Sequence, residues 1–122
     1  MGWYNMLQHH IAIICSSEQS LAFYNSLGFY QTKRVERSND TIIWMNDGQT
    51  TLELFVDPTH PPRVDRPEAM GLRHLAFETE DVRELREQLL PWNPEEIRIR
   101  DGVETFFVKD PDGCPMEIRG KV

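Results

Sequence analysis

The chain has 122 residues, of which 39% are hydrophobic and 27% charged, a composition typical of one globular domain. A formal net charge of −7 and the lack of a basic cluster argue against binding to nucleic acid. No apolar run approaches the roughly 20 residues of a membrane span, and no secretory signal is visible. We therefore expect a cytoplasmic protein without membrane association, with Cys15 and Cys114 as reduced thiols.

Residue patterns in the first half of the chain predict a βαβββ module over about residues 8–56. An apolar, β-branched run at 8–15 predicts a strand. Apolar residues at helical spacing then follow a candidate N-cap at Ser17 and end at Gly28, which favours a helix between them. Three further strands are expected at about 29–35, 41–46 and 50–56, with Asn46-Asp47-Gly48 as the turn of the last hairpin.

The second half predicts the same order of elements over about residues 72–120. A proline-rich connector at 57–71 precedes it. Asp81 and Glu84 resemble a capping box, and Pro91 ends the predicted helix. The elements expected are a strand at 73–78, a helix at 81–90 and strands near 96–100, 104–109 and 115–119. Each half alone is too small to bury a core, so we expect one domain over 1–122.

The two halves resemble each other, because a shift of 64 residues aligns the chain on itself. This single offset aligns three segments without a gap, which predicts a two-fold structural repeat. The fold class predicted is α+β, with two tandem βαβββ modules. The aligned segments are 10–13 with 74–77, 40–43 with 104–107, and 52–54 with 116–118.

The repeat places two histidines and two glutamates at equivalent positions. Side chains alternate between the faces of a strand, so each His or Glu lies opposite an apolar face. A buried carboxylate is costly unless it is paired or bound to a metal. Two imidazoles and two carboxylates suit a divalent Zn, Ni, Co, Mn or Fe. The predicted metal ligands are His10, Glu53, His74 and Glu117.

Other polar and aromatic residues are weaker candidates for function. Four arginines have the chemistry to hold an anionic substrate group, although surface ion pairs are the commoner role. The tryptophans are expected to be packing residues, and two further histidines are expected to be structural or exposed. These residues are Arg34, Arg37, Arg73 and Arg119; Trp3, Trp44 and Trp92; and His9 and His60.

Five segments in order resemble the vicinal oxygen chelate superfamily, whose best-known member is glyoxalase I. They are HHIAI, AFYNSLGF, LELF, GLRHLAF and DPDGCPMEI, and the resemblance covers residues 8–119. It implies that the two modules form a cupped mixed sheet around one divalent metal per site, held by the four residues named above. It also implies isomerisation of a hemithioacetal through an enediolate, with Glu117 or Glu53 as the catalytic base and Glu117 preferred. The superfamily also implies a homodimer whose metal site is shared between chains, and a small-molecule substrate.

The sequence departs from glyoxalase I at the two positions that grip glutathione in that enzyme. The family's Arg and Asn are replaced by Ile14 and Asp57, which cannot pair with a glutathione carboxylate. We therefore expect another oxo compound or thiol adduct as the substrate. The alternatives are an epimerase or dioxygenase of the same superfamily, or a small-molecule (drug) binding protein without catalysis. A monomer holding all four ligands is the alternative to the dimer.

Overall fold

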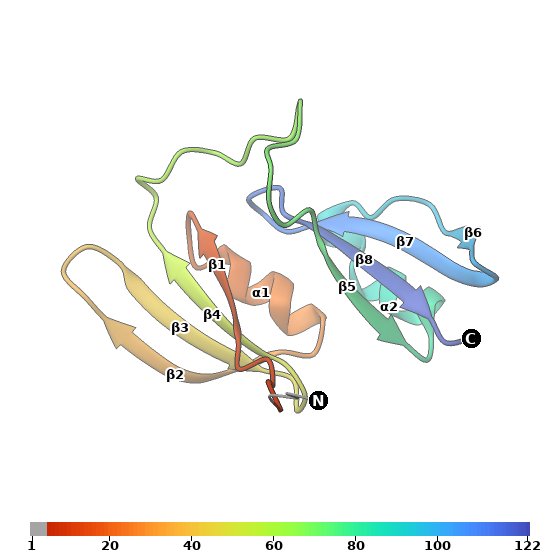
Figure 1. Cartoon of the computed structure of the whole chain (residues 1–122), viewed down its shortest axis with the longest axis horizontal. Helices are drawn as coiled ribbons and strands as arrows, with labels where there is room; N and C mark the ends of the chain where they lie inside the picture. Colours follow the sequence, from red (N-terminus) through yellow and green to blue (C-terminus); the bar gives the residue numbers. More distant parts are fainter. Residues whose placement is uncertain (1–4) are drawn as a thin grey trace.

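A computed structural model describes residues 5–122 and shows two modules of the same design (Figure 1). Trp3 lies outside the described residues. Module 1 contains β1 (Ile11–Cys15), α1 (Gln19–Ser26), β2 (Tyr30–Glu36), β3 (Thr41–Asn46) and β4 (Thr51–Val56). Module 2 contains β5 (Leu75–Thr79), α2 (Val82–Gln88), the short 3₁₀ helix η1 (Leu90–Trp92), β6 (Arg98–Arg100), β7 (Val103–Lys109) and β8 (Pro115–Gly120).

Each module forms a four-stranded mixed sheet with the same topology. The strand orders are β1-β4-β3-β2 and β5-β8-β7-β6. The first strand of each module pairs in parallel with the last, and the remaining pairs are antiparallel. This arrangement confirms the predicted tandem βαβββ fold. It also leaves β1 and β5 at sheet edges, each with one side unpaired in its own sheet.

The predicted repeat is correct for two of its three segments. Ala12 pairs with Glu53 and Ala76 pairs with Glu117, so the offset of 64 holds there. It is wrong for β3 and β7, where the partner of Glu53 is Trp44 and the partner of Glu117 is Phe107. These partners are 63 residues apart. The β7–β8 turn is one residue longer than the β3–β4 turn, so a gap is required.

Several predicted element boundaries also shift. The first strand begins at Ile11, later than predicted, so His10 lies immediately before it. The N-cap of α1 is Glu18, while the Ser17 hydroxyl accepts a hydrogen bond from the Gln19 N–H at 3.2 Å. Asp81 does cap α2, because its carboxylate accepts from the Glu84 N–H at 3.0 Å. The helix ends at Gln88, and the proline predicted to end it lies inside η1.

The apolar faces of both sheets and both helices contribute to one hydrophobic cluster. Its fully buried residues include Leu54 of β4 and Ile118 of β8. Aromatic rings join the modules directly, since Phe29 meets Phe77 edge-on with ring centroids 5.9 Å apart. Burying this much apolar surface is the main favourable term in folding. The faces that carry the predicted ligands therefore lie on the opposite side of each sheet.

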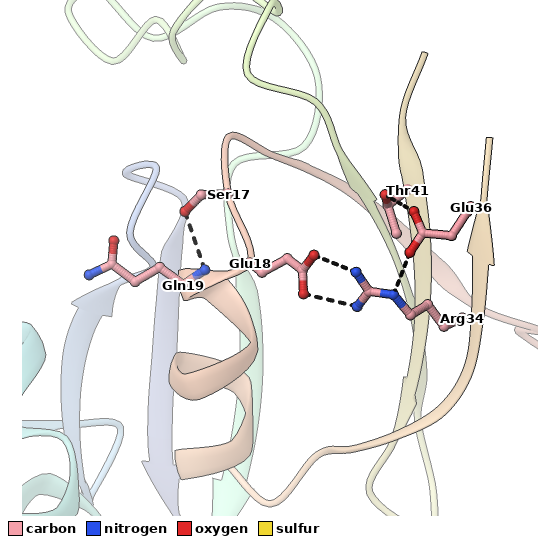
Figure 2. Close-up of polar contacts among 6 residues, drawn as sticks. All are labelled: Ser17, Glu18, Gln19, Arg34, Glu36 and Thr41. Carbon is pink, nitrogen blue, oxygen red and sulfur yellow. Dashed lines mark hydrogen bonds and ion pairs between the residues drawn. The ribbon is translucent and has the colours of Figure 1, made fainter. Parts of the chain in front are cut away.

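An ion-pair network fixes the start of α1 against β2 (Figure 2). The Arg34 guanidinium donates to both carboxylate oxygens of Glu18 and, through its Nε, to Glu36. Thr41 donates its hydroxyl to the second oxygen of Glu36 at 3.0 Å. The pKa values of both carboxyls are lowered, chiefly by their hydrogen bonds from Arg34. Arg34 therefore has a structural role.

The connector runs along one end of both modules, from β4 to β5 (Figure 1). Most of its residues are exposed, and one isolated bridge joins Asp65 to Glu68. Across residues 5–122, no helix combines the length and apolar character needed to cross a membrane.

Candidate metal centre

Module 1 brings His10 and Glu53 together on the face of its sheet that points away from the core. The His10 Nε2 lies 3.2 Å from the Glu53 Oε1. Trp44, the cross-strand partner of Glu53, meets the His10 ring edge-on with centroids 5.0 Å apart. The indole therefore packs against the imidazole beside its carboxylate partner and restricts its orientation.

Module 2 builds the same arrangement from different residues. The His74 Nε2 lies 3.5 Å from the Glu117 Oε1. Phe107 takes the place of the tryptophan and meets the His74 ring edge-on at 5.2 Å between centroids. The side-chain exposures also match, at 33% and 13% for the first His and Glu and 28% and 13% for the second. Each mostly covered carboxylate thus has an accessible imidazole beside it.

A single chain does not bring the four predicted ligands into one cluster. Within residues 5–122, no group of three or more His, Cys, Asp or Glu side chains is close enough to hold a metal. The two His–Glu pairs belong to separate sheets, and both sheets turn their apolar faces toward the shared hydrophobic cluster. Each pair supplies one imidazole nitrogen and one carboxylate, which is half of a four-coordinate site.

Trp44 and Phe107 are the neighbours of the ligands that the sequence analysis missed. Trp44 was predicted to be a packing residue, and the predicted alignment of 40–43 with 104–107 was off by one residue. Each ring lies on the strand next to a predicted ligand Glu, directly opposite it and on the same face of the sheet. Recognising this placement required the β3–β4 and β7–β8 registers. Trp92, by contrast, packs against Phe23 at 5.6 Å, as predicted.

A cleft with a volume of about 780 Å³ lies between β1 and β5, beside the connector. Its lining includes His74 but none of the other three predicted ligands. Apolar side chains dominate its floor, including Ile13 of β1 and Leu75 of β5. Both strands are edge strands, so the cleft lies beside backbone N–H and C=O groups that have no partner within their own sheet. Its position suits an association surface better than a complete catalytic site.

The two positions that differ from glyoxalase I lie four residues after His10 and Glu53, at the far ends of β1 and β4. Ile14 is exposed and shares its strand face with Ala12 and His10. Asp57 follows β4 and accepts hydrogen bonds from the Thr59 N–H and hydroxyl, which lower its pKa. Its carboxylate also lies 3.5 Å from His60. Neither side chain offers a cation to a glutathione carboxylate.

The arginines singled out in the sequence have different surroundings. Arg73 pairs with Glu68 in the connector at 2.9 Å. Arg37 makes two hydrogen bonds to Asp40 and lies 5.6 Å over the Phe55 ring. Arg119 differs, since its guanidinium lies 3.9 Å from Glu117 itself.

The thiols show no sign of activation. Cys15 is buried and Cys114 is half-buried. Burial raises the pKa of Cys15 to about 12 and that of Cys114 to about 11. Both remain protonated at neutral pH and are poor nucleophiles, in keeping with the prediction of structural thiols.

Comparison with known proteins identifies the family of this chain. The family model described as Glyoxalase/Bleomycin resistance protein/Dioxygenase superfamily matches residues 7–118. The chain belongs to this superfamily. It is similar to two uncharacterized bacterial proteins. YwkD of Bacillus subtilis (strain 168) is 42% identical, with 90% of this chain and 93% of YwkD covered. YaeR of Escherichia coli (strain K12) is 43% identical, with 90% and 92% covered.

Solved structures of the superfamily share the architecture. A glyoxalase family protein from Enterococcus faecalis superposes with a TM-score of 0.86 at 36% identity, covering 94% of this chain and 98% of that one. A trypanothione-dependent glyoxalase I from Leishmania major and a bleomycin-binding protein have the same fold at 24% and 16% identity, with TM-scores of 0.74 and 0.66. The superfamily thus contains both enzymes and binding proteins.

Proposed function

We propose that the protein is a metal-dependent lyase or isomerase of the glyoxalase I type, acting on a small oxo compound or hemithioacetal. The observation that carries this proposal is the pair of matching His–Glu contacts, each on the face of its sheet away from the core. The structure repeats the contact in both modules although the adjacent ring differs. A structural ion pair at one sheet would not need a copy at the other.

The donor atoms suit a divalent metal. His10 and His74 supply imidazole nitrogens, and Glu53 and Glu117 supply carboxylate oxygens that have few other partners. Two neutral imidazoles and two carboxylates balance a charge of +2, which relieves the cost of covering two acids. These four residues would hold the metal. When bound, the metal supplies Lewis-acid chemistry toward substrate oxygens.

The chain's own contribution is a base and a fixed geometry. A carboxylate at the site takes the C–H proton of the hemithioacetal carbon and returns it to the adjacent carbon, while the hydroxyl proton passes to the neighbouring oxygen, so the isomerisation has no net gain or loss of protons. Glu117 is the preferred base and Glu53 the alternative. Trp44 and Phe107 hold the imidazoles in orientation through their edge-on contacts. Substituting either ring would loosen the ligand set without removing a donor.

Glutathione is not the proposed thiol. Neither Ile14 nor Asp57 supplies a cation to bind the glutathione carboxylates. An apolar side chain gains nothing from a charged group, and an ionised Asp repels one. Turnover of the glutathione adduct of methylglyoxal should therefore be weak or absent, while other hemithioacetals or small oxo compounds are processed.

The complete site requires two chains in this proposal. One chain holds the His–Glu pairs in separate sheets, so His10 and Glu53 of one protomer would meet the second pair of its partner. The open edges of β1 and β5 and the apolar cleft between them are the surfaces that a second copy would cover. Sedimentation at the mass of two chains supports this assembly, and a monomer at all working concentrations contradicts it.

Metal analysis after native purification tests the function and separates it from simple binding. We expect one divalent ion per chain and its loss in His74→Ala, with a lower melting temperature, because a ligand bound only to the native state stabilises it. Glu87→Ala is the control, since Glu87 is exposed on α2, away from both His–Glu pairs. A panel of hemithioacetals assayed with several metals then identifies the substrate. Unchanged metal content in His74→Ala would refute the ligand assignment, and full metal without turnover of any substrate would favour a binding protein.

A further inference from the structure

Three arginines share the site face of module 2. Arg98 lies opposite Thr105 across the β6–β7 pair, and Thr105 lies opposite Arg119 across the β7–β8 pair. Residues directly opposite in neighbouring strands project to the same face, and so do residues two apart in one strand. Arg98, Arg100 and Arg119 therefore project from the face that carries Phe107 and Glu117. We call these three residues the arginine row.

The arginine row borders the second His–Glu pair. The Arg100 Cζ lies 6.0 Å from the centroid of the Phe107 ring, and that ring is the one that contacts His74. On the other side, the Arg119 Nη1 lies 3.9 Å from the Glu117 Oε2. A cation stacked on an aromatic face keeps its N–H donors free at the rim of the guanidinium plane. The donors are thus available beside the candidate ligands.

The charges of the arginine row are incompletely matched by acids. Among the described residues, Arg98 and Arg100 have no side-chain hydrogen bond or ion pair, and Arg119 has only long contacts to Asp101 and Glu117, at 3.7 and 3.9 Å. Glu78, the β5 partner of Arg119, is the other acid facing this surface. A divalent metal held by the His–Glu pairs would engage Glu117, so the arginine row would then face one acid fewer.

Module 1 carries fewer free cations on its site face: among the described residues, Lys33 lies opposite Trp44 across the β2–β3 pair and has no ion pair. Its one arginine above an aromatic ring on the site face, Arg37 over Phe55, donates two hydrogen bonds to Asp40 and is neutralised by it. The asymmetry matters because the chain as a whole is strongly acidic, with a net charge of −7. Unpaired arginines beside the site are therefore a local exception to the surrounding potential.

We infer that Arg100 and Arg119 bind an anionic group of the substrate, which makes the substrate a small oxo compound that carries a phosphate or carboxylate. Arg98 adds to the local potential from the sheet edge. The planar guanidinium fork matches the paired oxygens of either group, with two parallel N–H···O bonds. This assignment deepens the proposed function and rests on it. It also accounts for the loss of a glutathione grip at Ile14 and Asp57, because the anion is received by the other module.

Titration calorimetry on the metal-loaded protein tests the inference with three probes. Dihydroxyacetone phosphate carries the phosphate, pyruvate carries the carboxylate, and dihydroxyacetone is the uncharged counterpart. We expect at least one charged probe to bind, and to bind at least tenfold more tightly than dihydroxyacetone. Arg100→Met and Arg119→Met should each weaken that probe at least tenfold. Arg83→Met, which removes an exposed arginine from α2, should change it less than twofold.

Metal content measured in the same samples separates the two claims. Full metal content with equal binding of the charged probe to all four proteins refutes the arginine assignment and leaves the metal site standing. No metal in the unmodified protein, together with the expected loss of anion binding in both variants, refutes the proposed function and keeps the anion site. Tight binding of dihydroxyacetone with no preference for either charged probe also overturns the inference.

Discussion

Module 1 and module 2 hold the same His–Glu pair on equivalent strands, but the surroundings of the two pairs differ. Module 1 places Trp44 beside its histidine, and its nearby Arg37 is neutralised by Asp40. Module 2 places Phe107 there, and its arginine row is largely unpaired. The shared part is the donor set that a metal needs. In the proposed function, the two pairs form halves of one site, and the difference assigns recognition of the substrate's charge to module 2.

The turns that follow β3 and β7 also differ between the modules, in the burial and the partners of their aspartates. In module 1, Asp47 is exposed and accepts hydrogen bonds from backbone N–H groups within its own turn. In module 2, the longer turn buries Asp110, whose carboxylate accepts from the Cys114 N–H and, across the modules, from the Tyr24 hydroxyl at 2.8 Å. One turn closes a hairpin, whereas the other also joins the two modules.

Substituting the two glutamates separately gives the largest expected effect. Glu117→Gln should lower kcat about 10²- to 10⁴-fold at saturating metal, the usual contribution of a positioned general base. Glu53→Gln should weaken metal binding with a smaller loss of kcat once metal is saturating. Rates at matched metal content, with Glu104→Gln on the opposite face as control, measure the difference. Equal losses of kcat in both variants would assign the base role to neither residue alone.

Local sequence patterns predicted most of the fold, because turns and apolar alternation are encoded over a few residues. Gly28 adopts φ +100°, which explains why the helix signal ends there. The register of β3 and β7 escaped prediction, because one extra residue in a turn moves every partner and the segments aligned without it. The arginine row escaped for the same reason, since only cross-strand pairing brings Arg98 and Arg119 to one face.

The second-largest expected effect is a loss of folding stability when the hydroxyl that joins the modules is removed. Tyr24→Phe leaves the buried Asp110 Oδ2 without its donor, which typically costs about 1–3 kcal/mol. Urea unfolding of the metal-free protein measures this loss. Tyr30→Phe is the control, since Tyr30 is exposed on β2. A Tyr24→Phe variant as stable as the control would show that the turn contact does not hold the modules together.

The same turn should add a pH-dependent contribution to stability in module 2. Burial raises the pKa of Asp110 above its unfolded value of about 3.9, so the native state holds its proton more tightly. Relative to Asp110→Asn, the unmodified protein should therefore lose stability as pH rises from about 3.9 through the raised native pKa. Urea midpoints of both metal-free proteins across that range measure the difference. A constant difference at every pH would contradict the assignment.

The smallest expected effect concerns the ion pairs that join helix and strand in each module. Module 1 uses an acid at the helix start and a base on the strand, Glu18 with Arg34, whereas module 2 reverses the charges with Arg83 and Glu104. Because these groups are exposed, Arg34→Met and Arg83→Met should each lower stability only slightly, and less at high salt. Thermal melts at two salt concentrations test this. A large, salt-independent loss in either variant would indicate a packing role.

The most direct test of the central claim mixes His10→Ala chains with His74→Ala chains, refolds them together and measures bound metal. Neither variant alone should hold metal at a complete site. If each site takes one His–Glu pair from each chain, random exchange makes half of the dimers mixed, and each mixed dimer contains one intact set of four ligands. The mixture should then regain about one metal per four chains, a quarter of the unmodified content. A mixture that exchanges chains but regains no metal would contradict a site shared between the two modules of different protomers.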